Sequence, residues 1–154
     1  MTLGIRPERL LAETAAGEGT AKTAVIVTVR SEGVEGYGEG VMDPLPHYRE
    51  ETIAGATGLM RDALAPDLFA HGCEHPNELL DRWAKWRGNP MAKTALELAV
   101  WDCYARQQGV PLRELLGGDR TEIPVGASLG MNPVDVTVDS VTAHVEQGYR
   151  RVKL

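Results

Sequence analysis

The sequence has only two cysteines, Cys73 and Cys103, too few for a disulfide-rich secreted domain and too far apart for a paired metal-ligand motif. We therefore expect free thiols in a reducing compartment. No apolar run approaches the roughly 20 residues that a membrane-spanning helix needs. No leader of charged, then apolar, then small residues opens the chain. These absences predict a cytoplasmic protein without a membrane partner.

Positive charge is also scarce, because 16 Lys and Arg residues stand against 22 Asp and Glu, for a net charge of -6. No local cluster of Lys and Arg reverses this balance, so we expect no nucleic-acid partner. The histidines His47, His71, His75 and His144 lack the spacing of zinc ligands. The sequence itself therefore predicts no metal site.

Two β-strands are predicted near the start of the 154 residues. The β-branched run Ala24–Val29 has the period of a buried strand, and Val34–Glu39 can return beside it as a hairpin partner. Glu13–Lys22 lacks an apolar period and is predicted to be a mobile loop. Met1–Leu11 is broken by glycine and proline, so we expect at most a short strand there and an unpaired edge beside Ala24–Val29.

Three helices are predicted next. The first covers Tyr48–Leu64 and stops before Pro66. The second covers Pro76–Trp86, with Leu79, Leu80 and Trp83 on one stripe. The third runs from Asn89, as the capping residue, to Gly109, with Leu96, Ala99, Val100 and Cys103 on its apolar face. A sheet followed by helices predicts an α+β fold over residues 1–118.

The segment 119–154 has a different pattern. Ile123–Leu129 is predicted to be a strand, a valine-rich helix opens at Asn132, and Tyr149–Leu154 is a second strand. This β-α-β order implies two parallel strands. In the last strand Lys153 lies on the face opposite Val152, on the inner side of a curved sheet. We expect the chain to end inside a larger α/β domain.

Five motifs in this order resemble the N-terminal portion of the enolase superfamily, and most closely its o-succinylbenzoate synthase and N-acylamino acid racemase group. They are Gly36-Tyr37-Gly38-Glu39-Gly40, Pro46-His47-Tyr48-Arg49-Glu50-Glu51-Thr52, Met91 to Asp102, Gly109-Val110-Pro111-Leu112 with Leu115-Leu116-Gly117-Gly118, and Gly148 to Leu154. The resemblance implies an α+β capping domain, residues 1–118, followed by the first β-α-β unit, residues 119–154, of a truncated (β/α)8 barrel.

The resemblance also implies a chemistry. Members abstract a proton α to a carboxylate with lysines on both sides of the substrate and a divalent metal, usually Mg²⁺, that stabilises the enediolate. Lys153 matches the first lysine of the Lys-x-Lys motif on the second barrel strand, an auxiliary position. The base itself and the metal ligands would follow beyond residue 154. We therefore expect no Mg²⁺ site in this chain alone and no activity unless the barrel is completed.

Four further positions are implied to lie near a small carboxylate substrate. Ser128 matches a serine on the first barrel strand. Ala12, Thr14 and Asp43 match the two mobile loops of the capping domain that close over the barrel mouth. The family tends to place aromatic residues in the first of these loops, where this chain has Ala15-Ala16-Gly17.

Other conspicuous residues have structural interpretations. Glu97, Trp101 and Asp102 resemble an acidic site, but they lie on a helix that the family uses for packing. The glycines of Gly36–Gly40 resemble a phosphate-binding loop, but Glu39 would repel phosphate and no Lys-Ser/Thr follows. We interpret that segment as a turn.

Three hypotheses about function remain open. The chain is the N-terminal piece of a racemase or synthase, one half of a split enzyme with a complementary barrel chain, or a stand-alone capping domain that acts as a binding or assembly module. Two strands cannot close a barrel of eight, so the first is favoured, with catalysis absent from the isolated chain. The sequence leaves a homo-oligomer open.

Overall fold

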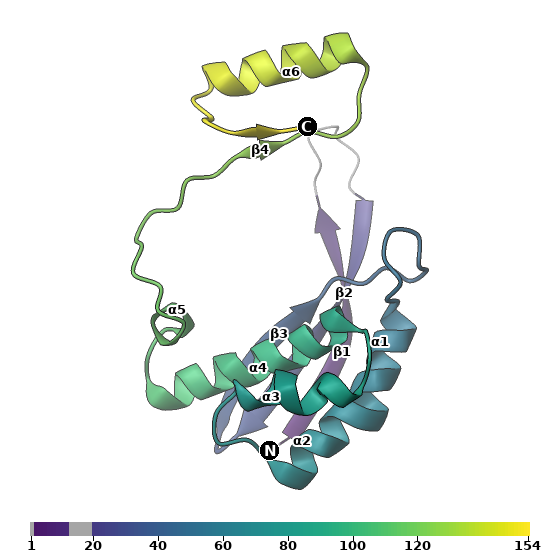
Figure 1. The fold of residues 1–154 in the computed structure, drawn as a ribbon, viewed down its shortest axis with the longest axis vertical. Helices are drawn as coiled ribbons and strands as arrows, with labels where there is room; N and C mark the ends of the chain where they lie inside the picture. Colours follow the sequence, from purple (N-terminus) through teal and green to yellow (C-terminus); the bar gives the residue numbers. More distant parts are fainter. Residues whose placement is uncertain (1, 13–19) are drawn as a thin grey trace. The chain divides into compact units, whose positions relative to one another are not determined.

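The computed structural model describes residues 2–12 and 20–154, and the chain divides into two compact units, Met1–Gly117 and Gly118–Leu154. The first unit is a three-stranded antiparallel sheet with helices on one face, and the second is a β-α-β unit (Figure 1). The predicted α+β class is confirmed.

Strand β1 (Thr2–Ala12) pairs with β2 (Thr20–Ser31) along its whole length. The prediction of a short first strand and an unpaired edge is therefore wrong. Pro7 lacks an N–H group, but β1 is an edge strand, where one side of the backbone has no partner strand to bond. Residues 20–22 of the predicted loop belong to β2, and residues 13–19 lie outside the described part of the chain.

Strand β3 (Val34–Gly40) pairs antiparallel with β2 and places its glycines opposite buried valines. The pairs are Gly36 with Val29, Gly38 with Val27 and Gly40 with Val25. All three valines are fully buried, as predicted. The predicted hairpin strand Val34–Glu39 is therefore confirmed, whereas the interpretation of Gly36–Gly40 as a turn is wrong.

Close packing against helix α4 (Pro90–Gln108) explains these glycines. A Cβ atom on Gly36 would lie 2.1 Å from the backbone nitrogen of Cys103, and one on Gly38 would lie 2.0 Å from the carbonyl oxygen of Ala95. The facing residues of α4 are Ala95, Ala99 and Cys103, which are small and follow one another at intervals of one helical turn. The missing side chains on β3 let the helix backbone approach the sheet.

Helix α1 (Ile53–Leu59), a π-helical segment (Met60–Leu64) and helix α2 (Ala65–His71) follow one another without a break. Both predicted ends of this helix are wrong. It starts at Ile53 because the Thr52 hydroxyl accepts the Gly55 N–H at 3.1 Å. It passes Pro66 because Ala65 N–H bonds to the Met60 carbonyl five residues back, a wider turn that accommodates proline.

Helix α3 (Glu78–Arg82) and the 3-10 turn Trp83–Lys85 occupy the second predicted helix. Leu79 and Trp83 are fully buried, as predicted. Leu80 is 47% exposed, so it does not belong to the buried face of this helix. Helix α4 ends at Gln108, with Gly109 as its C-cap, and α5 (Leu112–Leu115) follows. The predicted apolar face of α4 is confirmed, since these residues are buried: Leu96, Ala99, Val100 and Cys103.

The second unit contains strand β4 (Ala127–Ser128), helix α6 (Val134–Glu146) and strand β5 (Val152–Lys153). The two strands are parallel, which confirms the predicted β-α-β order. Both are shorter than predicted, and Leu154 is 77% exposed. No residue from 118 to 154 is buried, so this unit has no closed core of its own. Among the helices of the described residues, none is long and apolar enough to cross a membrane.

Candidate functional site

Ser128 and Lys153 lie opposite each other on the two parallel strands of the second unit. The register is fixed by backbone hydrogen bonds from Ala127 N–H to the Arg151 carbonyl, 3.0 Å, and from Leu129 N–H to the Lys153 carbonyl, 2.9 Å. Paired residues on adjacent strands project to the same face. A hydroxyl and an ammonium group therefore share one face.

A hollow of about 350 Å³ lies at this pair, lined by Gly126, Ala127, Ser128, Arg151 and Lys153. A Cβ atom at Gly126 would lie 2.9 Å from the Arg151 carbonyl oxygen, a backbone atom that cannot move aside as a side chain can. Both Ser128 and Lys153 are exposed in this unit. The hollow holds two cationic side chains and one hydroxyl, which suits an anionic ligand.

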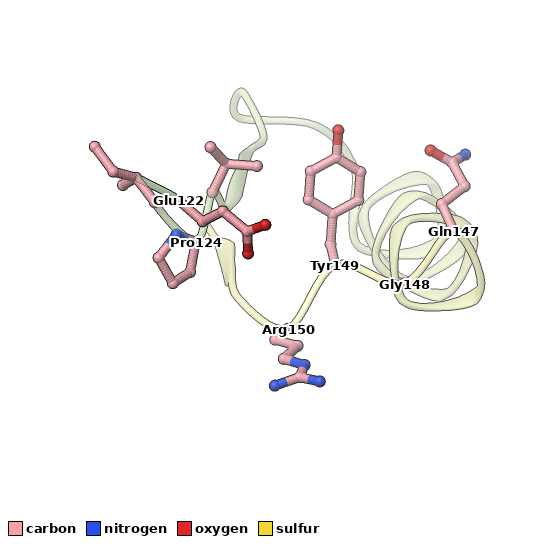
Figure 2. Close-up of a pocket in the computed structure, with 8 residues that line it drawn as sticks. Glu122, Pro124, Gln147, Gly148, Tyr149 and Arg150 are labelled. Atoms are coloured by element: carbon pink, nitrogen blue, oxygen red, sulfur yellow. The ribbon is translucent and has the colours of Figure 1, made fainter. Parts of the chain in front are cut away.

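A larger hollow of about 600 Å³ lies at the opposite ends of the same strands. Figure 2 shows Tyr149 and Glu122 near this space and the Arg150 side chain directed away from it. Its lining residues precede β4 and β5, whereas sites of parallel α/β folds lie at the carboxyl ends of the strands. Ile123 and Val125 on its wall are 76% and 70% exposed. We therefore interpret this hollow as an exposed apolar surface of the unit and do not take it as the candidate site.

The remaining predicted site residues lie in or beside the first unit. Ala12 is the last residue of β1 and pairs with Thr20, whereas Thr14 lies outside the described residues. Asp43 forms an isolated bridge with Thr52, and its carbonyl accepts the Ile53 N–H at 3.0 Å. Asp43 thus closes the neck of an exposed loop, residues 44–50.

This loop borders a third hollow, of about 210 Å³, lined by Val41, Met42, Asp43, Tyr48, Arg49 and Met91. Met42 is buried, whereas Tyr48 is 84% exposed. The Arg49 guanidinium lies 5.6 Å from the centre of the Tyr48 ring. The loop therefore presents an aromatic ring and a cation beside an apolar floor.

Sequence reasoning missed the role of Glu51. Asn89 was predicted to cap α4, but its side chain makes no capping hydrogen bond. Instead the Glu51 carboxylate accepts the N–H groups of Met91 at 2.8 Å and Ala92 at 3.0 Å. One signal was present, since the first turn of α4 contains no acidic residue and its N-terminal dipole needs a partner from elsewhere.

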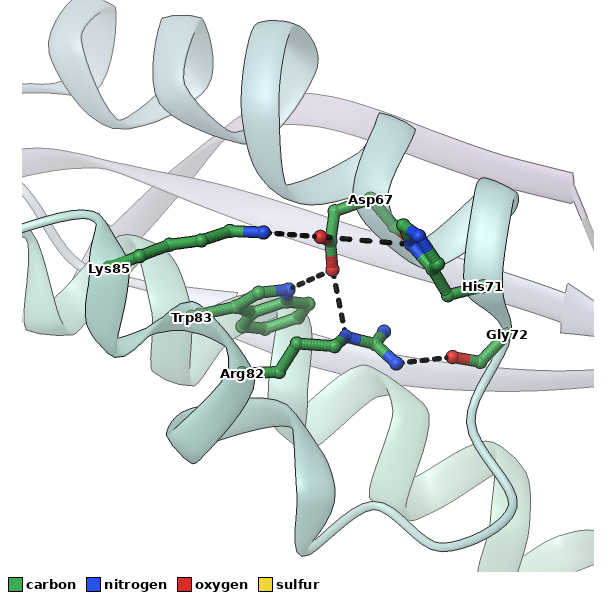
Figure 3. Close-up of polar contacts among 6 residues, drawn as sticks. All are labelled: Asp67, His71, Gly72, Arg82, Trp83 and Lys85. Carbon is green, nitrogen blue, oxygen red and sulfur yellow. Dashed lines mark hydrogen bonds and ion pairs between the residues drawn. The ribbon is translucent and has the colours of Figure 1, made fainter.

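Asp67 is the centre of a buried polar cluster that stabilises the helices (Figure 3). Its carboxylate accepts hydrogen bonds from Trp83 Nε1 at 3.0 Å and Lys85 Nζ at 2.9 Å, and Arg82 Nε lies 2.8 Å away. Burial raises the pKa of Asp67, but these hydrogen bonds and the two positive charges outweigh burial and hold the pKa below its ordinary value. These contacts join α2 to α3 and to the 3-10 turn, so we assign the cluster a structural role.

The acidic residues of α4 also have structural partners. Glu97 accepts a hydrogen bond from Trp101 Nε1 at 2.8 Å. Asp102 accepts one from the backbone N–H of Tyr37 at 2.9 Å and one from Arg106 at 3.0 Å. These contacts join the helix turns to each other and to β3, in line with the packing role that we expected.

Burial raises the pKa of both thiols, Cys73 and Cys103, and neither forms a disulfide. In the described residues no group of three or more His, Cys, Asp or Glu side chains is placed to hold a metal ion. The carboxylate and imidazole groups of the described residues therefore do not form a Mg²⁺ site.

The comparisons with known proteins agree with the fold. The sequence model of the mandelate racemase / muconate lactonizing enzyme N-terminal domain matches residues 4–117. The chain is 44% identical over 149 residues to the N-succinylamino acid racemase of Thermus thermophilus, covering 96% of this chain and 40% of the relative. It is 44% identical over 136 residues to the o-succinylbenzoate synthase of Geobacillus kaustophilus, covering 88% of this chain and 36% of the relative.

A solved structure of an enolase superfamily member from Listeria innocua matches 97% of this chain and 42% of its own, with a TM-score of 0.85 and 33% identity. The chain thus spans about two fifths of the length of these relatives. The sequence motifs, the family match and the fold all point to the same superfamily. The chain belongs to the enolase superfamily, as the N-terminal portion of a mandelate racemase / muconate lactonizing enzyme type protein.

Proposed function

We propose that this chain is the N-terminal portion of an enzyme of the o-succinylbenzoate synthase and N-acylamino acid racemase type, which abstracts a proton α to a carboxylate. Residues 1–118 would form the capping domain and residues 119–154 the first β-α-β unit of the barrel. The observation that carries this proposal is the in-register pair Ser128 and Lys153 on adjacent parallel strands.

Each site residue has a role in this proposal. The Lys153 ammonium would hold negative charge at the substrate carboxylate and its enediolate form, and the Ser128 hydroxyl would orient the substrate beside it. On this proposal Ala12, at the end of β1, together with Thr14 and Asp43 would mark the two segments that border the distal end of a small carboxylate substrate. Arg49 and Tyr48, which line the hollow beside Asp43, would provide a cation and an aromatic face for that end.

The family uses Mg²⁺, which when bound supplies Lewis-acid stabilisation of the enediolate. No metal ligand is assigned to the described residues of this chain, because their donor groups do not cluster. The ligands and the base lysine would come from the remaining barrel strands. On this proposal the 154-residue chain alone has no turnover.

A fusion protein tests the proposal. Residues 1–154 are joined to the remainder of the Thermus thermophilus N-succinylamino acid racemase, and racemisation of N-succinylamino acids and formation of o-succinylbenzoate are measured with Mg²⁺. We expect turnover from the fusion and a loss of about 100-fold or more in Lys153→Ala. Arg150→Ala is the matched control, because Arg150 precedes β5 and does not line the hollow at Ser128 and Lys153. Equal activity of Lys153→Ala and the parent fusion would contradict the role of Lys153.

A split enzyme is the second candidate, and one observation favours it. All buried core residues lie in the first unit, whereas the second unit leaves its apolar side chains exposed, including Ile123, Val125, Val134 and Val138. A separate chain that supplies the other barrel strands would cover them. Mixing this chain with a separately produced protein that contains the other barrel strands should then restore racemase or synthase activity, although the two chains are not covalently linked.

The self-contained core of the first unit also suits a stand-alone capping module. That reading predicts a monodisperse protein that melts cooperatively and binds a partner independently of Mg²⁺. Insoluble protein on expression would count against it.

A further inference from the structure

Glu51 joins two parts of the first unit that are far apart in the sequence. It follows the exposed loop 44–50 directly, and the residue as a whole is only 5% exposed. Both carboxylate oxygens accept backbone N–H groups from the first turn of α4, at Met91 and Ala92. A buried carboxylate at a helix N-terminus is a strong anchor, because it meets both the unpaired N–H groups and the positive end of the helix dipole.

The loop itself has few other attachments among the described residues. Its neck is closed by the Asp43 bridge to Thr52. Within the loop, one backbone hydrogen bond is found, from His47 N–H to the Leu45 carbonyl at 2.9 Å. The two hydrogen bonds of Glu51 therefore provide the main link between the C-terminal arm of the loop and the helix.

The hollow beside this loop depends on the same link. Asp43, Tyr48 and Arg49 form one wall, and Met91 of α4 belongs to the other. Glu51 binds the N–H group of Met91, so it ties the two walls together. A loss of this tie would let the loop wall move relative to the helix wall.

We propose that Glu51 is a positioning residue, whose carboxylate holds loop 44–50 against the N-terminus of α4 and thereby sets the width of the hollow between Tyr48 and Met91. The functional part of this inference rests on the proposed function, in which the loop borders the distal end of the substrate. Glu51 touches no reacting atom. Its effect would fall on the binding of that end and hence on substrate choice.

The first test measures backbone order in the 154-residue chain by nuclear magnetic resonance. In the unmodified chain we expect order parameters near 0.8 for the loop amides, and in Glu51→Ala values below about 0.6. Glu50→Ala is the matched control, because Glu50 is exposed on the same loop. Glu51→Gln keeps one acceptor oxygen and should give intermediate values, which also decides the question if Glu51→Ala does not fold. A loop that is disordered in the unmodified chain, or equally ordered in all four proteins, would overturn the proposal.

The second test uses the fusion protein of the preceding section. Glu51→Ala should raise KM about tenfold and change kcat by less than about threefold, with partial rescue in Glu51→Gln. A lower melting temperature with unchanged KM would show that Glu51 only stabilises the helix, and would overturn the proposal. If the parent fusion has no turnover, the proposed function fails, and the order parameters alone decide whether Glu51 holds the loop.

Discussion

The glycines of β3 lead to the most demanding prediction about this fold. Alanine at Gly38 would place its Cβ atom 2.0 Å from the Ala95 carbonyl oxygen and 2.8 Å from the Ala99 nitrogen, both backbone atoms of α4. A rotamer change cannot relieve a contact with backbone. Because ordinary contact begins near 3.4 Å, the helix must retreat by about 1.4 Å.

This movement would disturb the centre of the core. The row Val25, Val27 and Val29 packs beside the glycines, and its contacts with α4 would loosen as the helix moves away. Overpacking in well-packed cores costs about 1–3 kcal/mol and occasionally more. Since the obstruction here is backbone, we expect Gly38→Ala to lower the free energy of unfolding by about 3 kcal/mol.

Urea unfolding followed by tryptophan fluorescence measures this effect, because Trp83 and Trp101 are buried in the same unit. Gly58→Ala is the matched control. Gly58 lies in helix α1, and a Cβ atom there would meet nothing within 4 Å. This substitution should raise the free energy of unfolding by about 0.5–1 kcal/mol. A Gly38→Ala protein within about 0.5 kcal/mol of the parent would refute the close-packing argument.

Three further predictions concern the first unit. Asp67→Asn should lower the free energy of unfolding by about 2–3 kcal/mol, because Arg82 and Lys85 lose their common charged partner. The pKa of Asp67 is depressed in the folded state. Its contribution to stability is therefore present above the unfolded pKa near 3.9 and is lost as the pH falls through the folded pKa. Acid titration of the unfolding free energy should show this loss in the parent and not in Asp67→Asn. Thr52→Ala should cost about 1 kcal/mol, and Thr52→Ser should restore most of it, as measured by urea unfolding, since the hydroxyl caps α1. Thiol labelling at pH 7 should be slow for Cys73 and Cys103 and fast in urea, because burial raises both pKa values; rapid labelling of the folded chain would be inconsistent with this environment.

Periodicity predicted the elements whose side chains have one clear environment. The valine row of β2 and the apolar face of α4 are examples, because each is buried along its whole length. The parallel β-α-β order was likewise predictable from the turn residues around a valine-rich helix. These features follow from local pattern alone.

The remaining features depend on contacts between distant residues. The hairpin strand Val34–Glu39 was predictable, but its glycines at positions 36 and 38 also suggested a turn, and only the close approach of α4 explains why the strand contains them. Pro66 ordinarily ends a helix, but the π-helical turn before it removes the clash. Glu51 caps a helix that begins 39 residues later, a partnership that no local sequence pattern encodes. Strand β1 tolerates Pro7 because its partner lies on one side only.

Proton exchange at the α-carbon tests the central claim most directly. N-succinylamino acids are incubated with Mg²⁺ in deuterated water, with either the 154-residue chain or its fusion to the barrel remainder, and loss of the α-proton signal is followed by nuclear magnetic resonance. Our account predicts exchange with the fusion and none above background with the chain alone. Exchange catalysed by the isolated chain, or its absence from a folded fusion, would contradict it.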